Sequence, residues 1–292
     1  MGALQKIADF VPHIIADMSN EEYHAHPSIS KSGLDLIAKT PAHYYFEKIN
    51  ENEELKRERT KSLDVGTAFH YLALEPGSFD DHIAIDPDNW PTKKECGRTI
   101  EEQRQEFADK HPGKIILRPG NMDNMHNMAQ SIRNHPAARY LLQGKGMVEP
   151  SIFAREMIHD VDCRVRPDWL REDGLIIDLK TTKDASPSGF DKAIWNYRYH
   201  VQAAFYMDMY EIATGKKAAG FVLIPVENNP PFLAGEPVLL EEGDDWINLG
   251  RRAYMENIET YARCVAANEW PGYGSEVRKS MPAPWMNNLT TI

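Results

Sequence analysis

A carboxylate and an ammonium lie two residues apart in the segment IIDLKTT (176–182), which follows RPDWL (166–170) after a short polar turn. Both segments have the composition of strands, so together they predict a β-hairpin. Because side chains alternate along a strand, Asp178 and Lys180 are expected on one face, while their apolar neighbours point into the core. The second strand therefore holds one carboxylate and one ammonium side by side.

The residue types in this hairpin suit a divalent cation and the hydrolysis of a phosphodiester. If Asp168 ends the first strand next to Asp178, two carboxylates converge on one site, and hard Mg²⁺ prefers such oxygen ligands. Lys180 would then orient or activate the attacking water. Hydrolysis requires a metal-polarised phosphoryl oxygen, a nucleophilic water and stabilisation of charge on the leaving oxygen. The hairpin predicts a site that supplies these parts.

An acidic residue two positions before a lysine is not specific in itself. Chance produces such a pair on the order of once or more in a chain of this length and charge. Asp178 differs because it directly follows the apolar residues 175–177. A charge on a buried apolar strand is costly without a partner or a metal. Taken alone, the motif leaves a metal site and a structural ion pair as equal alternatives.

Two helical segments carry further polar residues. In GTAFHYLALEP (66–76), His70 stands among the apolar positions of a short buried helix, where a lone histidine is more often a satisfied core residue. The segment 185–214 predicts one helix, on which Gln202 and Tyr206 are four residues apart and therefore share a face. An amide and a phenol on one face suit contacts with phosphate or water, although a lone tyrosine there is more often a core aromatic.

Together these segments resemble the PD-(D/E)XK nuclease superfamily in its RecB-like form, and most closely the RecE exonuclease (exonuclease VIII) branch found in phages and prophages. The resemblance covers nearly the whole chain and implies an α/β nuclease core, a central mixed sheet flanked by helices, with N-terminal helical additions. The segments that carry it, in the family's order, are SISKSGLDLIAKTPAHYYFEK (28–48), GTAFHYLALEP (66–76), HPAARYLL (135–142), CRVRPDWL (163–170), IIDLKTTKDAS (176–186), NYRYHVQAAFY (196–206) and EWPGY (269–273).

The resemblance implies roles for individual residues. It makes Asp168 and Asp178 metal ligands, Lys180 the catalytic lysine and His70 the helix histidine that binds near the metal. The implied metal is Mg²⁺, with Mn²⁺ as a substitute. A glutamine and a tyrosine match the family's QxxxY motif. The residues that the resemblance places in catalysis are Lys180, Asp168, Asp178, His70, Gln202 and Tyr206.

The resemblance also implies further metal ligands. The family's upstream acidic ligand falls on Glu149 in MVEPSIFA, with Glu156 as the alternative because a proline interrupts this strand-like segment. The backbone carbonyl of Leu179 is another implied ligand. Lys183 and Arg198 lie close in sequence to the site and are candidates for binding DNA.

The implied activity is that of a Mg²⁺-dependent exodeoxyribonuclease acting on double-stranded DNA ends. Such an enzyme would degrade the 5′-ended strand and leave a 3′ single strand for a single-strand annealing recombinase. An endonuclease or a single-strand nuclease of the same fold is the alternative within the enzyme class. A catalytically inactive DNA-binding module is the alternative outside it, and the intact Asp168, Asp178 and Lys180 disfavour it.

The net charge of −11 runs against DNA binding, because neutralising phosphates requires lysine and arginine. Binding depends on the local potential more than on the total charge, so basic residues gathered along a channel would resolve the conflict. The family resemblance implies a homo-oligomeric ring that encloses DNA. We therefore expect such a ring, with an acidic outer face and a basic channel.

Length and composition favour one elaborated domain. With 292 residues, of which 42% are hydrophobic, the chain can bury a sizeable core. We divide it into a helical N-terminal extension (1–60) and a nuclease core (61–292) with an insertion at 85–119. No N-terminal signal sequence is recognised, and the longest apolar run (218–226) is too short to span a bilayer, so we expect a cytoplasmic protein with no membrane contact. The three scattered cysteines favour neither a disulfide framework, nor a zinc site, nor an iron–sulfur cluster.

Overall fold

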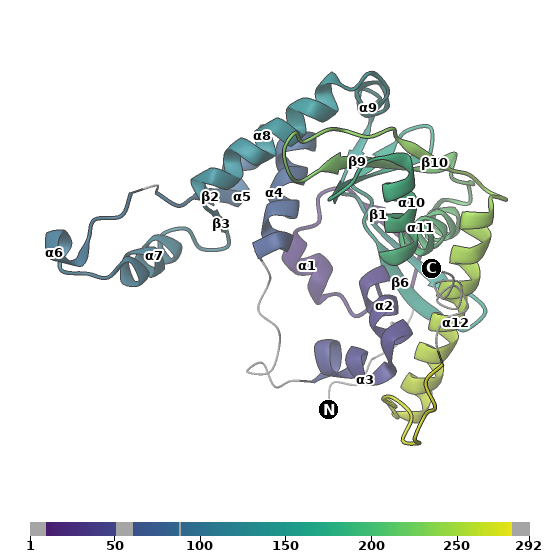
Figure 1. Ribbon diagram of the computed structural model, residues 1–292. Helices are drawn as coiled ribbons and strands as arrows, with labels where there is room; N and C mark the ends of the chain where they lie inside the picture. The colour runs from purple at the N-terminus through teal and green to yellow at the C-terminus, as the bar shows by residue number, and fades with distance from the viewer. Residues whose placement is uncertain (1–9, 51–60, 88, 282–292) are drawn as a thin grey trace, which may run out of the picture.

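The computed structural model describes residues 10–50, 61–87 and 89–281, and its centre is a mixed sheet of five strands (Figure 1). The strand order is β10-β9-β8-β7-β4. Strands β8 and β9 run parallel, and the other neighbouring pairs are antiparallel. The strands are β4 (Gly146–Val148), β7 (Trp169–Arg171), β8 (Leu175–Thr182), β9 (Gly220–Glu227) and β10 (Val238–Leu240).

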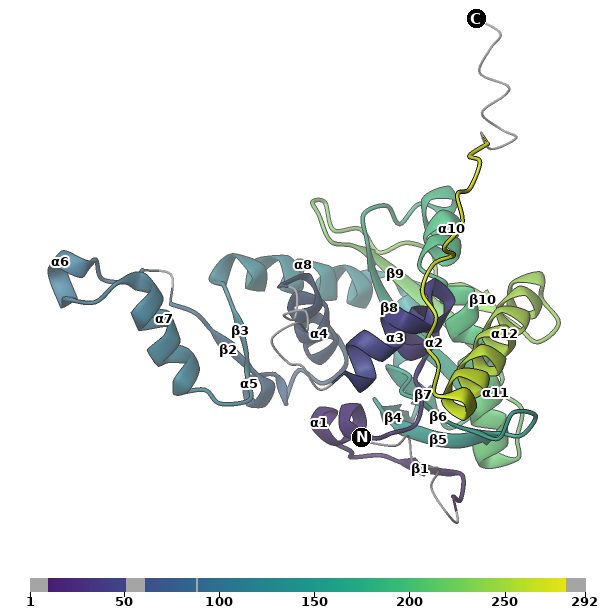
Figure 2. The same cartoon turned by 90° about the horizontal axis from the view of Figure 1, so that it is seen from below.

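Helices cover both faces of this sheet, as the view from below shows (Figure 2). One face packs against α10, α11 and α12 through a core that includes Ile176 and Phe205. The other face packs against α4 and α8 through Ile177, Leu179 and Met125. Successive residues of β8 thus enter different cores, which confirms the expected alternation and the predicted fold class. The helices are α4 (Lys61–Leu74), α8 (Pro119–Asn134), α10 (Pro187–Asn196), α11 (Tyr199–Thr214) and α12 (Asp245–Ala267).

Strands β7 and β8 form the predicted hairpin. Trp169 pairs with Ile177 and Leu170 with Ile176, and the turn residue Gly174 has a φ of 83°, which only glycine adopts without steric cost. Strand β8 has eight residues and β7 has three. The second half of β8 therefore extends past β7 and has an open edge on that side, where polar side chains can approach the strand.

The segment expected as one helix over 185–214 is two helices, α10 and α11. The chain turns between them at Arg198, whose φ of 57° lies in the left-handed region. The Arg198 guanidinium donates to the Asp35 carboxylate at 2.9 Å and to the Asn257 side chain at 2.7 Å. These contacts with distant parts of the chain hold the unfavourable backbone conformation. The segment has no proline or glycine at this point, so its sequence predicts no break.

A second, three-stranded sheet has the order β1-β5-β6 and packs through β5 on α11. It contains β1 (His13–Ile15), β5 (Ser151–Glu156) and β6 (Val161–Val165). Strand β1 belongs to the segment expected to be helical, which also holds α1 (Asn20–Ala25), α2 (Lys31–Lys39), α3 (Pro41–Tyr44) and the π-helix η1 (Tyr45–Ile49). Residues 1–9 and 51–60 of that segment lie outside the described residues. The division of the chain at residue 60 stays a prediction.

The predicted insertion projects from the body of the molecule, and both views show it extending away from the central sheet (Figures 1 and 2). Its base is a parallel pair of short strands, β2 and β3. It also contains the helix α7, which begins with a capping box between Thr99 and Glu102. The elements of this region are α5 (Phe79–His82), β2 (Ile83–Ile85), α6 (Lys93–Cys96), α7 (Ile100–Asp109) and β3 (Ile115–Leu117).

Among the described helices, α12 is the longest, with 23 residues. It alternates buried residues such as Ile258 with charged ones such as Arg251, which pairs with Asp208 of α11 at 2.7 Å. It is therefore an amphipathic helix that closes the core. Within the described ranges, no helix combines the length and the apolar character needed to cross a bilayer.

Candidate active site

The register of the central sheet sets three carboxyl-bearing residues in one row. Continued by one residue, the pairing of β7 with β8 places Asp168 opposite Asp178. The pairing of β4 with β7 likewise places Glu149 opposite Asp168, and the Glu149 amide donates to the Asp168 carbonyl at 3.0 Å. Opposite residues of antiparallel strands are close neighbours. The hairpin thus brings together the two aspartates, as the sequence predicted, and adds Glu149 beside them.

The open edge of β8 supplies backbone groups to this row. The Leu179 amide, which no strand pairs on that side, donates to Oδ2 of Asp168 at 2.7 Å. On the other side of the same carboxylate, Nδ1 of His70 lies 3.5 Å from Oδ1. A hydrogen bond with the Leu179 backbone also acts on the His70 ring. Helix α4 therefore delivers the predicted histidine to the strand edge where Asp168 lies.

Asp178 is in a different environment although it is the neighbour of Asp168. It is 2% exposed, and its Oδ2 forms an ion pair with the Lys180 ammonium. Its Oδ1 accepts a hydrogen bond from Nε2 of Gln202 at 2.7 Å. Both oxygens of this buried carboxylate therefore have a partner, and the first residue of the QxxxY motif is one of them.

The ionisation of these groups follows from burial and from their mutual charges. Burial raises the pKa of Asp168 well above its usual range, and the charge of Asp178 raises it further. Burial and the charge of Asp168 also raise the pKa of Glu149. Burial lowers the pKa of His70, so its imidazole is neutral near pH 7. Burial alone would lower the pKa of Lys180, but Asp178 and Asp168 outweigh it and the pKa is raised.

Tyr206, the second residue of the QxxxY motif, lies deeper in the core. Its ring packs edge-on against Phe221 with the ring centroids 5.9 Å apart. Burial raises the pKa of its hydroxyl well above the ordinary value, and the charges of Asp178 and Asp168 are among the further causes. Tyr206 is thus a neutral phenol behind the carboxylates, whereas Gln202 touches one of them directly.

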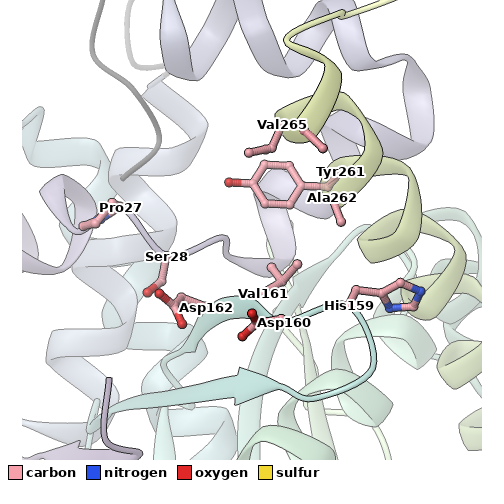
Figure 3. A pocket seen from close by; sticks show the side chains of 10 residues that line it. Pro27, Ser28, His159, Asp160, Val161, Asp162, Tyr261, Ala262 and Val265 are labelled. Carbon is pink, nitrogen blue, oxygen red and sulfur yellow. The ribbon is translucent and has the colours of Figure 1, made fainter. Parts of the chain in front are cut away.

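The two candidates for the upstream acidic ligand lie beside different sheets, because Glu149 directly follows β4 of the central sheet and Glu156 belongs to the second sheet. Glu156 ends β5, and its carboxylate accepts hydrogen bonds from the Ile158 and His159 amides at 2.8 and 2.9 Å. His159 borders a separate pocket of about 190 Å³ beneath α12 (Figure 3). Glu156 therefore holds its own turn together. The structure brings Glu149, and not Glu156, to Asp168.

The two cations predicted to bind DNA differ in what surrounds them. Lys183 is exposed, directly after the end of β8. Arg198 instead bonds to Asp35 and Asn257, which occupy its guanidinium within the fold. Binding of DNA by either residue stays a prediction.

The sequence did not point to a polar groove of about 380 Å³ beside the end of β8. It passes Thr181, the neighbour of Lys180, and Gly66, where an added Cβ would meet only open space. Its other lining residues are mostly amides and one cation, which could contact a nucleic-acid backbone. These residues are Arg118, Asn121, Asn124 and Asn228, with Val65 and Met128. They come from three separate segments, so no local motif connects them.

The residues of the site fit a divalent cation by their chemistry. Two carboxylates with raised pKa values and a neutral imidazole face one another, and a cation would offset their repulsion. In the described part of the chain, no three His, Cys, Asp or Glu side chains are grouped as a preformed metal cluster. Lys180 and Gln202 occupy the Asp178 oxygens instead. A cation at Asp178 would therefore share this carboxylate with the Lys180 ammonium or displace it, because each carboxylate oxygen has two lone pairs.

Comparisons with known proteins identify the family of this chain. Residues 30–279 match the family described as a PDDEXK-like domain of unknown function (DUF3799), and the chain belongs to that family. Pro167, Asp168, Asp178 and Lys180 have the residue types and order of the PD-(D/E)XK pattern, and their assignment to that motif stays a prediction. Enzymes of this superfamily generally use divalent metals, so the family supports a metal-using nuclease.

Solved structures give a similar result for the fold. A crystal structure of a proposed exonuclease from Eubacterium rectale has a TM-score of 0.62 and 16% sequence identity, covering 94% of this chain and 99% of that one. A second structure, that of SSO0001, has a TM-score of 0.29 and 12% identity over 69% of this chain and 87% of that one. The first match supports the fold alone, and the second carries no weight. No curated protein matches the chain significantly.

Proposed function

We propose that the protein is a Mg²⁺-dependent exodeoxyribonuclease of the RecE type, which degrades the 5′-ended strand at double-stranded DNA ends and leaves 3′ single strands. The observation that carries the proposal is the hairpin in which Asp168 stands opposite Asp178, with Lys180 in contact with the latter. Family membership supports the nuclease class. The exonuclease specificity and the strand polarity rest on the resemblance of the whole sequence.

The residues of the site would divide the reaction between them. Asp168, Asp178 and the Leu179 carbonyl would hold the cation, with His70 and Glu149 beside them. When bound, the cation would polarise a phosphoryl oxygen and lower the pKa of the attacking water. The water oxygen then attacks phosphorus, and the bond from phosphorus to the leaving oxygen breaks.

Lys180 acts on the same reaction as a donor of hydrogen bonds. Its raised pKa keeps the ammonium protonated at neutral pH, so it orients the attacking water and stabilises the charge that develops on the phosphate. Gln202 positions Asp178 through its hydrogen bond to Oδ1. A protonated Lys180 is not available as a general base, so the water must lose its proton to another acceptor.

The acidic net charge and the DNA substrate are compatible if the protein works as a homo-oligomeric ring. Several subunits would share one duplex, so each would need few phosphate contacts, with Lys183 and the groove at Arg118 as candidates. A single-strand annealing recombinase would be the partner that receives the 3′ strand. Light scattering measures the number of subunits in solution and so tests the ring directly. A monomer that nonetheless degrades long DNA processively would contradict the ring.

Linear and closed circular DNA separate the exonuclease from its alternatives. We expect Mg²⁺-dependent degradation of a linear duplex, loss of a 5′ label before a 3′ label, and no cleavage of the closed circle. Asp178→Asn is the matched inactive control. Cleavage of the circle would favour an endonuclease of the same fold, and degradation restricted to single strands would favour a single-strand nuclease.

A further inference from the structure

The junction between α10 and α11 exposes aromatic side chains, and one tyrosine of this junction contacts the catalytic lysine. Trp195 and Tyr197 are 56% and 61% exposed, although large aromatic residues are usually buried. Between Tyr197 and the site lies Tyr199, which is half-buried. Exposed aromatic rings next to a catalytic centre indicate a contact surface for a ligand.

Two ring contacts connect the solvent to the Lys180 ammonium. Nζ of Lys180 lies 4.7 Å from the centre of the Tyr199 ring, which is the geometry of a cation–π contact. The Tyr199 ring in turn stacks on Tyr197, with centroids 5.6 Å apart and an interplanar angle of 26°. The two tyrosines therefore form a short stack, which we call the tyrosine ladder, and much of the Tyr197 side chain is open to solvent.

Two cations lie next to the Tyr197 end of the ladder. The Lys31 ammonium donates to the Tyr197 carbonyl at 3.0 Å and pairs with Asp35 at 2.7 Å. Arg198 pairs with the same Asp35 carboxylate at 2.9 Å. Two cations thus share one carboxylate, which leaves a local positive charge next to Tyr197. This is the sign that attracts a phosphate backbone.

The backbone at the ladder is held in a fixed shape. Arg198, between the two tyrosines, adopts the left-handed conformation that non-glycine residues rarely take. Its side chain is tied to α2 through Asp35 and to α12 through Asn257. A strained conformation that distant contacts hold in place is often part of a binding site. Tyr197 is accordingly presented on a rigid support.

We propose that the tyrosine ladder stacks an unpaired base of the DNA strand whose phosphate lies at Lys180. Aromatic rings next to positive charge bind single strands in this way, because every base has a π-face to stack on. A base inside a duplex is covered on both faces by its neighbours, so the ladder selects strands with unpaired nucleotides. The inference rests on the proposed nuclease function and narrows its substrate to a frayed or single-stranded end.

Binding to an oligonucleotide that carries 2-aminopurine at its terminal position tests the ladder. The measurement is made in EDTA at low salt, so that no strand is cleaved. We expect Tyr197→Ala to weaken single-strand binding by roughly 5- to 150-fold and to remove the fluorescence change on stacking. Tyr197→Phe keeps the ring and should bind as the wild type does. Tyr140→Ala removes a ring that is 72% exposed on α9 (Pro136–Leu142), at the far end of β4, and is the matched control.

Unchanged single-strand binding by Tyr197→Ala would overturn the ladder. An equal loss of binding in Tyr197→Phe or in Tyr140→Ala would overturn it as well. A loss of the same size on a blunt duplex would show that no unpaired base is recognised. The proposed function can fail separately. Binding that depends on the Tyr197 ring, without any Mg²⁺-dependent cleavage, would keep the ladder and reject the nuclease. Cleavage with binding that does not depend on the Tyr197 ring would reject the ladder alone.

Discussion

The β7–β8 hairpin positions two buried carboxylates, Asp168 directly before β7 and Asp178 within β8, and the two are in opposite electrostatic states. Asp178 has a cation and an amide on its oxygens. Asp168 has a backbone amide and a neutral histidine, and its pKa is raised well above normal. The fold therefore compensates one negative charge and leaves the other uncompensated. Such an excess of negative charge is what a divalent cation would neutralise.

The largest expected effect separates catalysis from metal binding. Lys180→Ala should reduce the cleavage rate by about three orders of magnitude or more, because it removes the donor that stabilises charge on the phosphate. Mg²⁺ affinity should stay similar or increase, because Asp178 is freed from its ion pair. Cleavage rates and calorimetric titration of Mg²⁺ check both parts. A loss of Mg²⁺ binding as large as in Asp178→Asn would show that Lys180 only holds the carboxylates in place.

The ion pair between Asp178 and Lys180 predicts that Asp178→Asn destabilises the metal-free protein. The substitution leaves the Lys180 ammonium largely buried without its counter-charge, which costs about 3 kcal/mol in comparable pairs. Loss of repulsion between the carboxylates would by itself have the reverse effect and stabilise the fold. Unfolding by denaturant in EDTA measures the change. An Asp178→Asn protein as stable as the wild type would mean that the ion pair contributes nothing.

Asp168→Asn should instead stabilise the metal-free protein. It removes the charge that burial and Asp178 disfavour, and the amide oxygen can still accept the Leu179 hydrogen bond. We expect about 1 kcal/mol of stabilisation in EDTA at neutral pH. In Mg²⁺ the order should reverse, because only the wild type binds the cation well. A destabilised Asp168→Asn protein in EDTA would contradict the uncompensated charge.

The difference in stability between Asp168→Asn and the wild type should depend on pH. The folded-state pKa of Asp168 is raised, so the cost of keeping it ionised is fully present above that pKa, decreases as the pH falls below it, and is gone below the pKa of an unfolded aspartate. The advantage of Asp168→Asn over the wild type should therefore shrink on acidification. Denaturation in EDTA at a series of pH values gives the profile. An advantage that stays constant down to acidic pH would exclude Asp168 as its source.

The smallest effects concern the two glutamates. Glu149→Gln should weaken Mg²⁺ binding and cleavage with little loss of stability, because burial and Asp168 already disfavour its charge. Glu156→Gln should lose about 1 kcal/mol of stability through its turn and leave cleavage unchanged. Each variant is the control for the other. Loss of cleavage in Glu156→Gln at full stability would reverse the assignment.

The sequence predicted features that depend on neighbouring residues. The hairpin, the alternation along β8 and the approach of Asp168 to Asp178 all follow from local pattern and strand geometry. The break at Arg198 could not be predicted, because Asp35 and Asn257, which hold it, are far away in the chain. The sequence left Glu149 and Glu156 open for a similar reason. They are only seven residues apart, and pairing between distant strands places Glu156 at the end of β5 in the second sheet and Glu149 directly after β4 of the central sheet.

The contact between Lys180 and Tyr199 could not be predicted from the sequence either. Both residues lie in segments that carry the family resemblance, and neither the strand pattern nor the helix pattern brings them together. Their contact depends on the start of α11, which the left-handed Arg198 sets. Residues that adjust a site from a neighbouring element are thus found from the structure, while the residues of the motif are found from the sequence.

Release of acid-soluble nucleotides from linear double-stranded DNA tests the central claim, that the hairpin is a metal-dependent nuclease site. Wild type, Asp168→Asn, Asp178→Asn and Lys180→Ala are compared with and without Mg²⁺, at a temperature where all four are folded. We predict release by the wild type in Mg²⁺, none in EDTA, and none above background from the three variants. Release in EDTA, or near wild-type release by Asp178→Asn, would contradict the account.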